Sequence, residues 1–240
     1  MNLWIRLIVL YQVNLKNYNK EGISMKIDEL VNYIIEICKK NKLNKVYICG
    51  NGGSGKTTLS RKIAEVAVSN GNVNIISMDD FMANTELRKN AKVEWEEDGI
   101  KYEGRYTSSN FETYFLKNVY EILYNIDHGV DCYYFPRRYK EKNNMRQLSS
   151  DYFLTVIEGI GTVFLEKNKE KSLTILLKCD KENEIKRREV RTKELNRKAI
   201  ELYDEKRSSQ YRVNVLSHES EFDLVISNDE EFNYIIEKGI

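Results

Sequence analysis

Short apolar runs alternate with longer amphipathic segments along most of the chain. Five runs rich in Val, Ile, Leu and aromatic residues have the length of strands, namely 45–50, 73–78, 151–159, 173–180 and 222–229. Helical patterns occupy 56–68, 108–123 and the charged stretch 182–213. Because strands that are apolar throughout are buried on both faces, this alternation predicts an α/β fold with a mainly parallel sheet flanked by helices.

The segment that starts at Met25 has apolar residues at helical spacing. One face would carry Ile27, Leu30, Val31, Ile34 and Cys38. Ser24 is available as the N-cap of this helix. We therefore predict that the folded domain begins at Met25 and covers residues 25–240.

The preceding residues 1–24 have no such pattern. The run "MNLWIRLIVLYQV" is interrupted by Arg6, is not followed by a small-residue cleavage site, and is too short to span a bilayer. We predict an N-terminal extension outside the core, with a partner-binding arm as the alternative.

A capping-box pattern opens the helical segment near residue 110. Ser109 and Glu112 have the spacing of the box. The buried stripe of this helix would consist of Phe111, Phe115, Val119, Leu123 and Ile126.

The amino-acid composition limits the kinds of partner that this chain is expected to bind. The 38 basic and 37 acidic side chains give a net charge of +1, which offers no electrostatic reason to expect nucleic acid or a membrane surface as partner. The four cysteines form no C-x-x-C pair and only two histidines are present, so neither a zinc site nor a disulfide framework is indicated. We expect a cytoplasmic protein with a small-molecule substrate, and the sequence leaves a homo-oligomer open.

The stretch "VYICGNGGSGKTTLSRK" contains the pattern G-x-x-x-x-G-K-[ST] between a predicted strand and a predicted helix. Its backbone N–H groups would cradle the phosphates of ATP. The residues expected to bind the nucleotide are Gly50, Asn51, Gly52, Gly53, Ser54, Gly55, Lys56, Thr57 and Thr58. Lys56 would reach the β- and γ-phosphates, and the Thr57 hydroxyl would bind Mg²⁺; a glycine-rich turn without a ligand is the alternative.

Three carboxylates follow predicted strands. Glu158 ends one strand and could hold Mg²⁺, or could be a surface carboxylate. Asp79 and Asp80 follow another strand, where one of them could receive the proton of an acceptor hydroxyl or both could cap the next segment. The carboxyl ends of parallel strands meet at one edge of a sheet, so these groups should lie close together.

Taken together, these motifs resemble the uridine kinase/phosphoribulokinase family of P-loop kinases. The phosphate loop is followed by "SMDDF" and then by "VIEG". The family writes its second motif S-x-D-x-F, so the resemblance implies that Asp79 is the catalytic base and that Asp80 occupies a variable position. It also implies a P-loop NTPase fold with a helical lid, and ATP with Mg²⁺ as cofactors.

The resemblance extends to the lid. Family members carry an Arg-Arg-x-x-Arg segment that closes over ATP, and "RREVR" matches it. Arg188 and Arg191 would neutralise charge on the transferring phosphoryl group, and Arg187 would bind the nucleotide. The alternative is a solvated helix face with pairs such as Glu184–Arg188. The family often has Arg-Asp where this chain has Arg191-Thr192.

The sequence says less about which molecule would accept the phosphoryl group. The Asp-His-Pro type of segment found in true uridine kinases does not occur, and "DGIKYEGRYTSSNFE" stands after the base motif instead. The candidate acceptor contacts are Asp80, Arg105, Tyr106, Tyr134 and Arg138. The last four, as a set, could equally be packing or surface residues. The expected acceptor is nucleoside-like with a primary hydroxyl.

The sequence therefore predicts an ATP-dependent small-molecule kinase. The alternative is a P-loop protein that binds or hydrolyses nucleotide without small-molecule kinase activity. A regulatory GTPase would need an [NT]-K-x-D motif and an ABC-type ATPase a Leu-Ser-Gly-Gly motif, and the chain has neither. The identity of the acceptor and the choice between ATP and GTP stay open.

Overall fold

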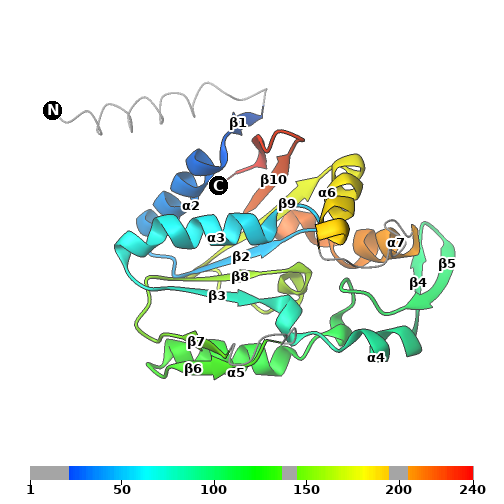
Figure 1. Cartoon of the computed structure of the whole chain (residues 1–240), viewed down its shortest axis with the longest axis horizontal. Helices are drawn as coiled ribbons and strands as arrows, with labels where there is room; N and C mark the ends of the chain where they lie inside the picture. Colours follow the sequence, from blue (N-terminus) through cyan, green and yellow to red (C-terminus); the bar gives the residue numbers. More distant parts are fainter. Residues whose placement is uncertain (1–21, 137–144, 195–204, 240) are drawn as a thin grey trace.

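The computed structural model describes residues 22–136, 145–194 and 205–239. Its centre is a seven-stranded sheet in the order β1-β11-β10-β9-β2-β8-β3 (Figure 1). Five neighbouring strands are parallel. They are β2 (Lys45–Cys49), β3 (Val73–Ser77), β8 (Leu154–Glu158), β9 (Ser172–Cys179) and β10 (Leu224–Asn228). The five apolar runs of the sequence are these strands, which confirms the predicted fold class.

One edge of the sheet is antiparallel and was not predicted. Strand β11 (Tyr234–Lys238) turns back along β10, and β1 (Ile23–Met25) pairs with β11. Ser24 is therefore a strand residue opposite Ile235, and the prediction that it caps the following helix is wrong. Helix α2 (Ile27–Asn41) has Lys26 as its N-cap, and the backbone N–H of Lys26 donates to Glu29 Oε2 at 2.8 Å.

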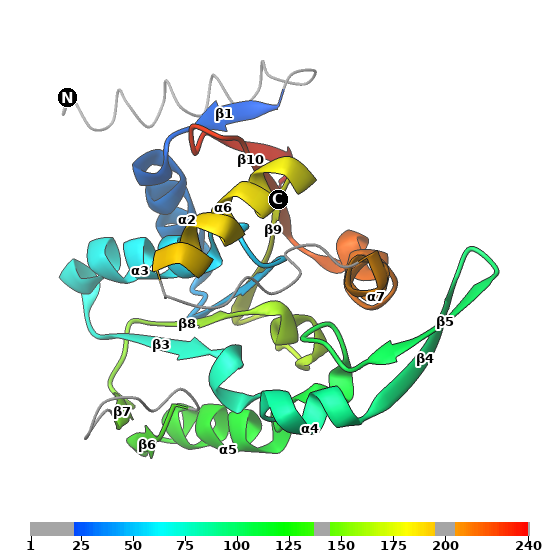
Figure 2. The same ribbon diagram turned by 45° about the vertical axis from the view of Figure 1, so that its right-hand side comes forward.

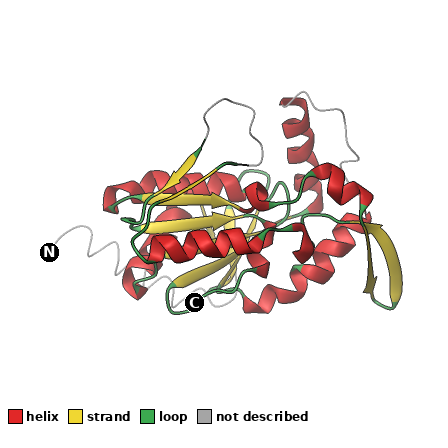
Figure 3. Ribbon diagram, turned by 90° about the horizontal axis from the view of Figure 1, so that it is seen from below, coloured by secondary structure: helices red, strands yellow, loops and turns green. Residues whose placement is uncertain are grey.

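The alternating side chains of the central strands separate two apolar layers. In β2, Val46 and Ile48 face α2 and α3 (Lys56–Ala67), whereas Tyr47 faces the layer that contains α5 (Leu116–Asp127). Figure 3 shows helices on both sides of the strands. The predicted apolar face of α2 is confirmed, because its residues from Leu30 to Cys38 at helical spacing are buried.

The predicted start of α5 is wrong. The helix begins at Leu116 and not at a capping box, and Phe111 and Phe115 are 56% and 57% exposed. Thr107 N–H donates to Asn110 Oδ1 at 2.8 Å. A side-chain oxygen therefore accepts from this backbone N–H group, ahead of the predicted capping box. Such local bonds compete with helix formation. The later stripe residues Val119, Leu123 and Ile126 are buried as predicted.

A β-hairpin of β4 (Lys92–Glu97) and β5 (Ile100–Arg105) projects from one end of the molecule (Figure 2). Asp98 and Gly99 form its turn with φ values of 51° and 79°. The base of the hairpin packs against α7 (Glu205–Asn214), where Trp95 Nε1 donates to Ser209 Oγ at 2.8 Å.

The remaining elements complete the two layers. They are α4 (Thr85–Asn90), α6 (Lys181–Glu194), β6 (Cys132–Tyr134), β7 (Arg146–Leu148) and the short 3₁₀ turns η1 (Val68–Asn70), η2 (Met78–Phe81), η3 (Phe111–Thr113), η4 (Ile160–Phe164) and η5 (Leu216–Glu221). Within the described ranges, each helix is too short or too polar to cross a membrane.

Candidate active site

The glycine loop connects β2 to α3 as the motif requires. Gly50 has a φ of 151°, and a Cβ there would lie 2.1 Å from the carbonyl oxygen of Leu177 on the neighbouring strand. Gly53 and Gly55 also have positive φ values, of 87° and 94°. These conformations favour glycine, and they turn the loop at the amino end of α3, where the helix dipole attracts phosphate.

Lys56 is the first residue of α3, and its ammonium is held within the loop. Nζ donates to the carbonyl oxygen of Asn51 at 2.7 Å and lies 3.5 Å from Ser54 Oγ. Burial lowers the pKa of Lys56, and the carboxylates of Glu158 and Asp79 oppose this shift. The ammonium is thus placed among the two carboxylates that the sequence assigns to the metal and to the base.

Glu158 sits at the end of β8, between the phosphate loop and β3. Its Oε1 accepts a hydrogen bond from Ser77 Oγ at 2.9 Å and lies 3.4 Å from Thr57 Oγ1. Burial raises the pKa of Glu158, while Lys56 and the hydroxyl of Ser77 oppose the rise. A buried carboxylate favours an arriving cation, because the cation offsets a charge that water solvates poorly.

This arrangement fits Mg²⁺ bound to a nucleotide. No group of three or more His, Cys, Asp or Glu is placed to hold a metal ion in the described part of the chain. Mg²⁺ at a nucleotide commonly takes one or two protein ligands and completes its shell with phosphates and water. Thr57 and Glu158 are two such oxygen donors on one side of the loop.

The adjacent residues Asp79 and Asp80 face different neighbours. Both lie in the 3₁₀ turn η2, which directly follows β3. The charge of Asp79 acts on Lys56 and on Glu158. Asp80 Oδ2 instead accepts a hydrogen bond from Tyr134 Oη at 3.4 Å, and its charge contributes to raising the pKa of Tyr134 after burial. Asp79 is therefore the carboxylate of the pair that belongs to the phosphate-loop site.

Helix α6 covers the phosphate loop through Arg188. Arg188 forms an ion pair with Glu184 one turn earlier, and its Nη2 lies 3.2 Å from Asn51 Oδ1. Asn51 Nδ2 donates to Glu184 Oε2 at 2.8 Å, so the loop and the helix share one polar network. The Glu184–Arg188 pair that the sequence suggests is present, and it lies at the site rather than on a solvated face.

Arg187 forms hydrogen bonds with the phosphate loop and with the end of β10. Its Nη1 donates to Gly53 O at 3.1 Å and to Asn228 Oδ1 at 2.5 Å, and its Nη2 donates to Asp229 O at 2.6 Å. These bonds fasten α6 to β10. Arg191 also lies in α6, but its side chain is outside the described residues.

The predicted acceptor contacts are spread over several elements. Arg105 is exposed at the end of β5, and Tyr106 after it is partly buried. Tyr134 packs against Phe81 with ring centroids 5.0 Å apart. Arg138 lies outside the described residues. The structure thus brings the loop, Asp79 and Glu158 together, and it does not gather the acceptor candidates into one group.

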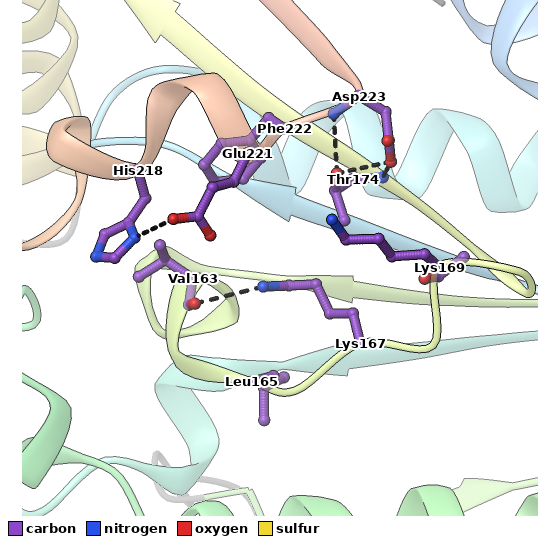
Figure 4. Close-up of a pocket in the computed structure, with 10 residues that line it drawn as sticks. Val163, Leu165, Lys167, Lys169, Thr174, His218, Glu221, Phe222 and Asp223 are labelled. Carbon is purple, nitrogen blue, oxygen red and sulfur yellow. Dashed lines mark hydrogen bonds and ion pairs between the residues drawn. The ribbon is translucent and has the colours of Figure 1, made fainter.

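Two of the cavities lie away from the phosphate loop. Figure 4 shows one of about 160 Å³, lined by Lys167, Thr174, His218 and Glu221 among others. It lies beside the amino-terminal half of β9, whereas the loop follows the carboxyl end of β2. The other, of about 350 Å³, is lined by residues of α5 and β6 and by Phe81. Neither is lined by residues 50–58.

Two polar side chains at the site, one partly buried and one buried, were not assigned a role from the sequence. Ser77, inside the base motif, bonds Glu158, and the serine of that motif was the available signal. Asn228 is 4% exposed, and its amide donates to Ser54 O at 2.8 Å and to Lys178 O at 3.0 Å. No local pattern indicates this role, because its partners lie about 50 and 174 residues away in the chain.

Comparison with known proteins gives one family. The model of the phosphoribulokinase/uridine kinase family matches residues 46–225. No curated protein matches the chain significantly.

Three solved structures are similar at low identity. The protein YGR205w is 14% identical, covering 88% of this chain and 97% of that one with a TM-score of 0.49. A possible uridine kinase from Bacillus stearothermophilus is 18% identical, covering 82% and 98% with a TM-score of 0.44. D-glycerate 3-kinase from Cryptococcus neoformans var. grubii serotype A is 10% identical, covering 85% and 72% with a TM-score of 0.41. At these identities and TM-scores, the three structures support no conclusion about the substrate of this chain.

Proposed function

The chain belongs to the phosphoribulokinase/uridine kinase family, and from this premise we propose that it moves the γ-phosphate of ATP to a hydroxyl group of a small metabolite. The observation that carries the proposal is the position of Asp79. Its carboxylate acts on both Lys56 and Glu158, so a base, a phosphate-binding ammonium and a candidate metal ligand share one site. Transfer to an alcohol needs this combination.

Each group has a distinct task in this mechanism. The backbone N–H groups of the loop and Lys56 bind the phosphates, and Arg188 adds positive charge from α6. Thr57 and Glu158 would hold Mg²⁺, which when bound offsets the negative charge of the phosphates. Asp79 orients the acceptor hydroxyl and takes its proton as the oxygen attacks the γ-phosphorus. ADP leaves, and the phosphate monoester of the acceptor is the product.

The sequence favours a nucleoside-like acceptor, and this finer proposal has partial support. Tyr134 stands close to the base motif, as a stacking residue would need to. Its ring is already packed on Phe81, and its hydroxyl is bonded to Asp80. Nucleosides are therefore included among the acceptors in the following test.

The test is ATP consumption with Mg²⁺ and a panel of alcohols. We expect ADP release that depends on an added acceptor such as uridine, cytidine, nicotinamide riboside, pantothenate or a simple sugar. The competing function is a nucleotide-binding P-loop protein without small-molecule kinase activity. Tight ATP binding combined with hydrolysis that no alcohol stimulates would favour that competitor.

A further inference from the structure

Asp79 stands in a turn of four residues, η2, which we call the base turn. At its start, the turn continues β3, whose last residue Ser77 pairs with Glu158 of β8. At its end, an isolated antiparallel bridge joins Met82 to Tyr114. A 3₁₀ turn of this length has few and poorly aligned hydrogen bonds of its own. The position of Asp79 therefore depends on what holds the two ends of the turn.

Two backbone hydrogen bonds form the bridge at the carboxyl end of the base turn. Ala83 N–H donates to the carbonyl oxygen of Thr113 at 2.8 Å, and Phe115 N–H donates to the carbonyl oxygen of Phe81 at 2.8 Å. Phe81 is the last residue of the base turn, and Ala83 lies two residues further on. Residues 113–115 thus fasten the end of the turn that β3 does not hold.

Residues 113–115 connect η3 to α5, and two side-chain hydrogen bonds hold them in place. Thr113 Oγ1 donates to the carbonyl oxygen of Thr107 at 2.7 Å. Tyr114 Oη donates to the carbonyl oxygen of Ser108 at 2.7 Å. Thr113 is 2% exposed, so water does not compete for its hydrogen bond. The hydroxyl of Thr113 is thus a buried tether between two parts of one loop.

Thr107, which accepts this hydrogen bond, is itself anchored. Its backbone N–H donates to Asn110 Oδ1 at 2.8 Å. Its own hydroxyl donates to Gln210 Oε1 of α7 at 2.5 Å. Thr107 and Asn110 are buried. The tether of Thr113 therefore ends on a loop that is packed against α7.

Tyr114 brings the same segment against the strand that carries the candidate metal ligand. A Cβ on Gly161 would lie 2.6 Å from Tyr114 Cε1, so the ring packs directly on the backbone of η4. This turn begins two residues after Glu158, the last residue of β8. Residues 113–115 therefore contact both the base turn and the turn that follows Glu158.

The place of Thr113 separates it from the groups that bind the nucleotide. Its hydrogen bonds go to Thr107, Asn110 and Ala83, and none of these residues belongs to the phosphate loop. A loss of its hydroxyl would act first on the bridge and the base turn. A displacement of about 1 Å caused by a change away from the reacting atoms can cost about a hundredfold in rate.

We propose that Thr113 is a positioning residue for Asp79. Its hydroxyl holds the segment whose carbonyl oxygen fastens the end of the base turn, and it acts on the reaction through the position of the Asp79 carboxylate. The inference rests on the proposed function, because Asp79 is the base of that reaction.

The first experiment compares Thr113→Val, which keeps the size of the side chain without its hydroxyl, with Thr113→Ser, which keeps the hydroxyl. With an acceptor that stimulates the wild-type protein, Thr113→Val should lower kcat by about 10- to 100-fold while KM for ATP changes less than about twofold. Thr113→Ser should keep kcat within about threefold of the wild-type value. An unchanged kcat in Thr113→Val, or an equal fall in both variants, overturns the proposal.

Thr174→Val is the matched control. Thr174 is 8% exposed, and its Oγ1 donates to Asp223 Oδ2 at 2.7 Å in the amino-terminal half of β9. Both valine variants should melt a few degrees lower, because each loses a buried hydrogen bond. Only Thr113→Val should lower kcat at a temperature where both are folded, and a fall shared by the two variants overturns the proposal. Thr113→Ala replaces Thr113→Val if the latter does not fold.

A second experiment asks whether Thr113 acts through Asp79. Asp79→Asn removes the base, so the position of this side chain should then matter little. Adding Thr113→Val to Asp79→Asn should lower kcat further by less than about twofold. Losses that multiply in the double variant would show that Thr113 affects turnover by another route, and they would overturn the proposal.

A third measurement does not require turnover. Amide hydrogen exchange at Ala83 and Phe115 reports the two hydrogen bonds of the bridge. Thr113→Val should speed exchange at both amides by at least about tenfold, and Thr174→Val should leave it unchanged. Unchanged exchange in Thr113→Val overturns the proposal. If exchange changes as expected but no alcohol stimulates ATP consumption by the wild-type protein, the proposed kinase function fails and the support of the base turn by Thr113 stands.

Discussion

Asp79 and Asp80 are neighbours in the chain with the same side chain, and the 3₁₀ turn after β3 gives them different surroundings. Asp79 shares the electrostatic environment of Lys56 and Glu158, whereas Asp80 meets Tyr134. A base must reach the acceptor hydroxyl beside the γ-phosphate, so the two carboxylates should differ sharply in catalysis.

Asp79→Asn should leave ATP binding largely intact and lower kcat by about 10²–10⁴, the range for a positioned base. Asp80→Asn serves as the matched variant and should cost much less, because Asp80 accepts a hydrogen bond from Tyr134 and is not the carboxylate that acts on Lys56 and Glu158. Steady-state kinetics and nucleotide titration of both variants measure this. The opposite order of effects would move the base to Asp80.

Lys56→Ala should reduce kcat to below about a tenth of the wild-type value, because the ammonium binds phosphates that gain charge during transfer. Lys62→Ala is the control in the same helix, since Lys62 pairs with Asp28 at 3.1 Å, outside the loop. Normal turnover by Lys56→Ala would remove this residue from the mechanism.

Residues of the site differ in how far the sequence could identify them. Lys56, Thr57, Asp79 and Glu158 belong to short motifs at strand ends, so their convergence follows from the parallel sheet. Asn228 ends β10 with no motif around it, and it meets Ser54 and Arg187 only where β10, the phosphate loop and α6 come together. Such a meeting depends on tertiary structure, which local patterns do not contain.

At the scale of elements, the parallel strands were predictable because each is a continuous apolar run. The hairpin β4–β5 was missed, although Asp98-Gly99 is a strong signal for a two-residue hairpin turn. The start of α5 was mispredicted for a different reason. The backbone N–H and carbonyl groups of Thr107 bond the side chains of Asn110 and Thr113, and a capping-box pattern cannot reveal this competition.

Asn228 joins three elements at the end of β10. Its amide bonds the phosphate loop and β9, and its oxygen accepts from Arg187 of α6. Asn228→Ala would leave buried partners unsatisfied, so the free energy of unfolding should fall by about 1–3 kcal/mol. KM for ATP should rise because the phosphate loop loses the hydrogen bond between Asn228 and the carbonyl oxygen of Ser54. Denaturation and kinetics measure both effects.

The control for Asn228→Ala is Asn41→Ala. Asn41 is exposed at the end of α2, where its amide donates to Ile37 O at 2.9 Å. We expect its loss to change the stability only slightly and KM for ATP not at all. If both variants behave alike, Asn228 does not support the loop.

At the scale of the whole molecule, the balanced net charge conceals a local imbalance. Basic and acidic residues number 38 and 37, yet Lys56, Arg187 and Arg188 all contact the phosphate loop. The composition gave no reason to expect a partner recognised through global charge, and it had no bearing on the substrate. The positions of these charges, and not the total charge, distinguish the phosphate loop from the rest of the surface.

The described part of the chain begins next to β1, the strand at the edge of the sheet farthest from β3. The sequence predicts an extension over residues 1–24, and residues 1–21 lie outside the described part of the chain. Ile23 and Ser24 pair with β11, and Met25 is 5% exposed in the apolar layer of α2. Two shortened chains separate these contributions, one beginning at Gly22 after an initiator Met and one beginning at Met25.

The chain beginning at Gly22 should keep the melting temperature and the ATP consumption of the full chain. The chain beginning at Met25 loses two of the three residue pairs of β1, so it should melt a few degrees lower. Its kinetics at a temperature where it is folded should stay unchanged, because β11, β10 and β9 separate β1 from the phosphate-loop strand β2. Thermal melting and acceptor-stimulated ADP release measure the two properties. A loss of activity in the folded chain that begins at Gly22 would show that residues 1–21 take part in the reaction, and the extension would then be a functional arm.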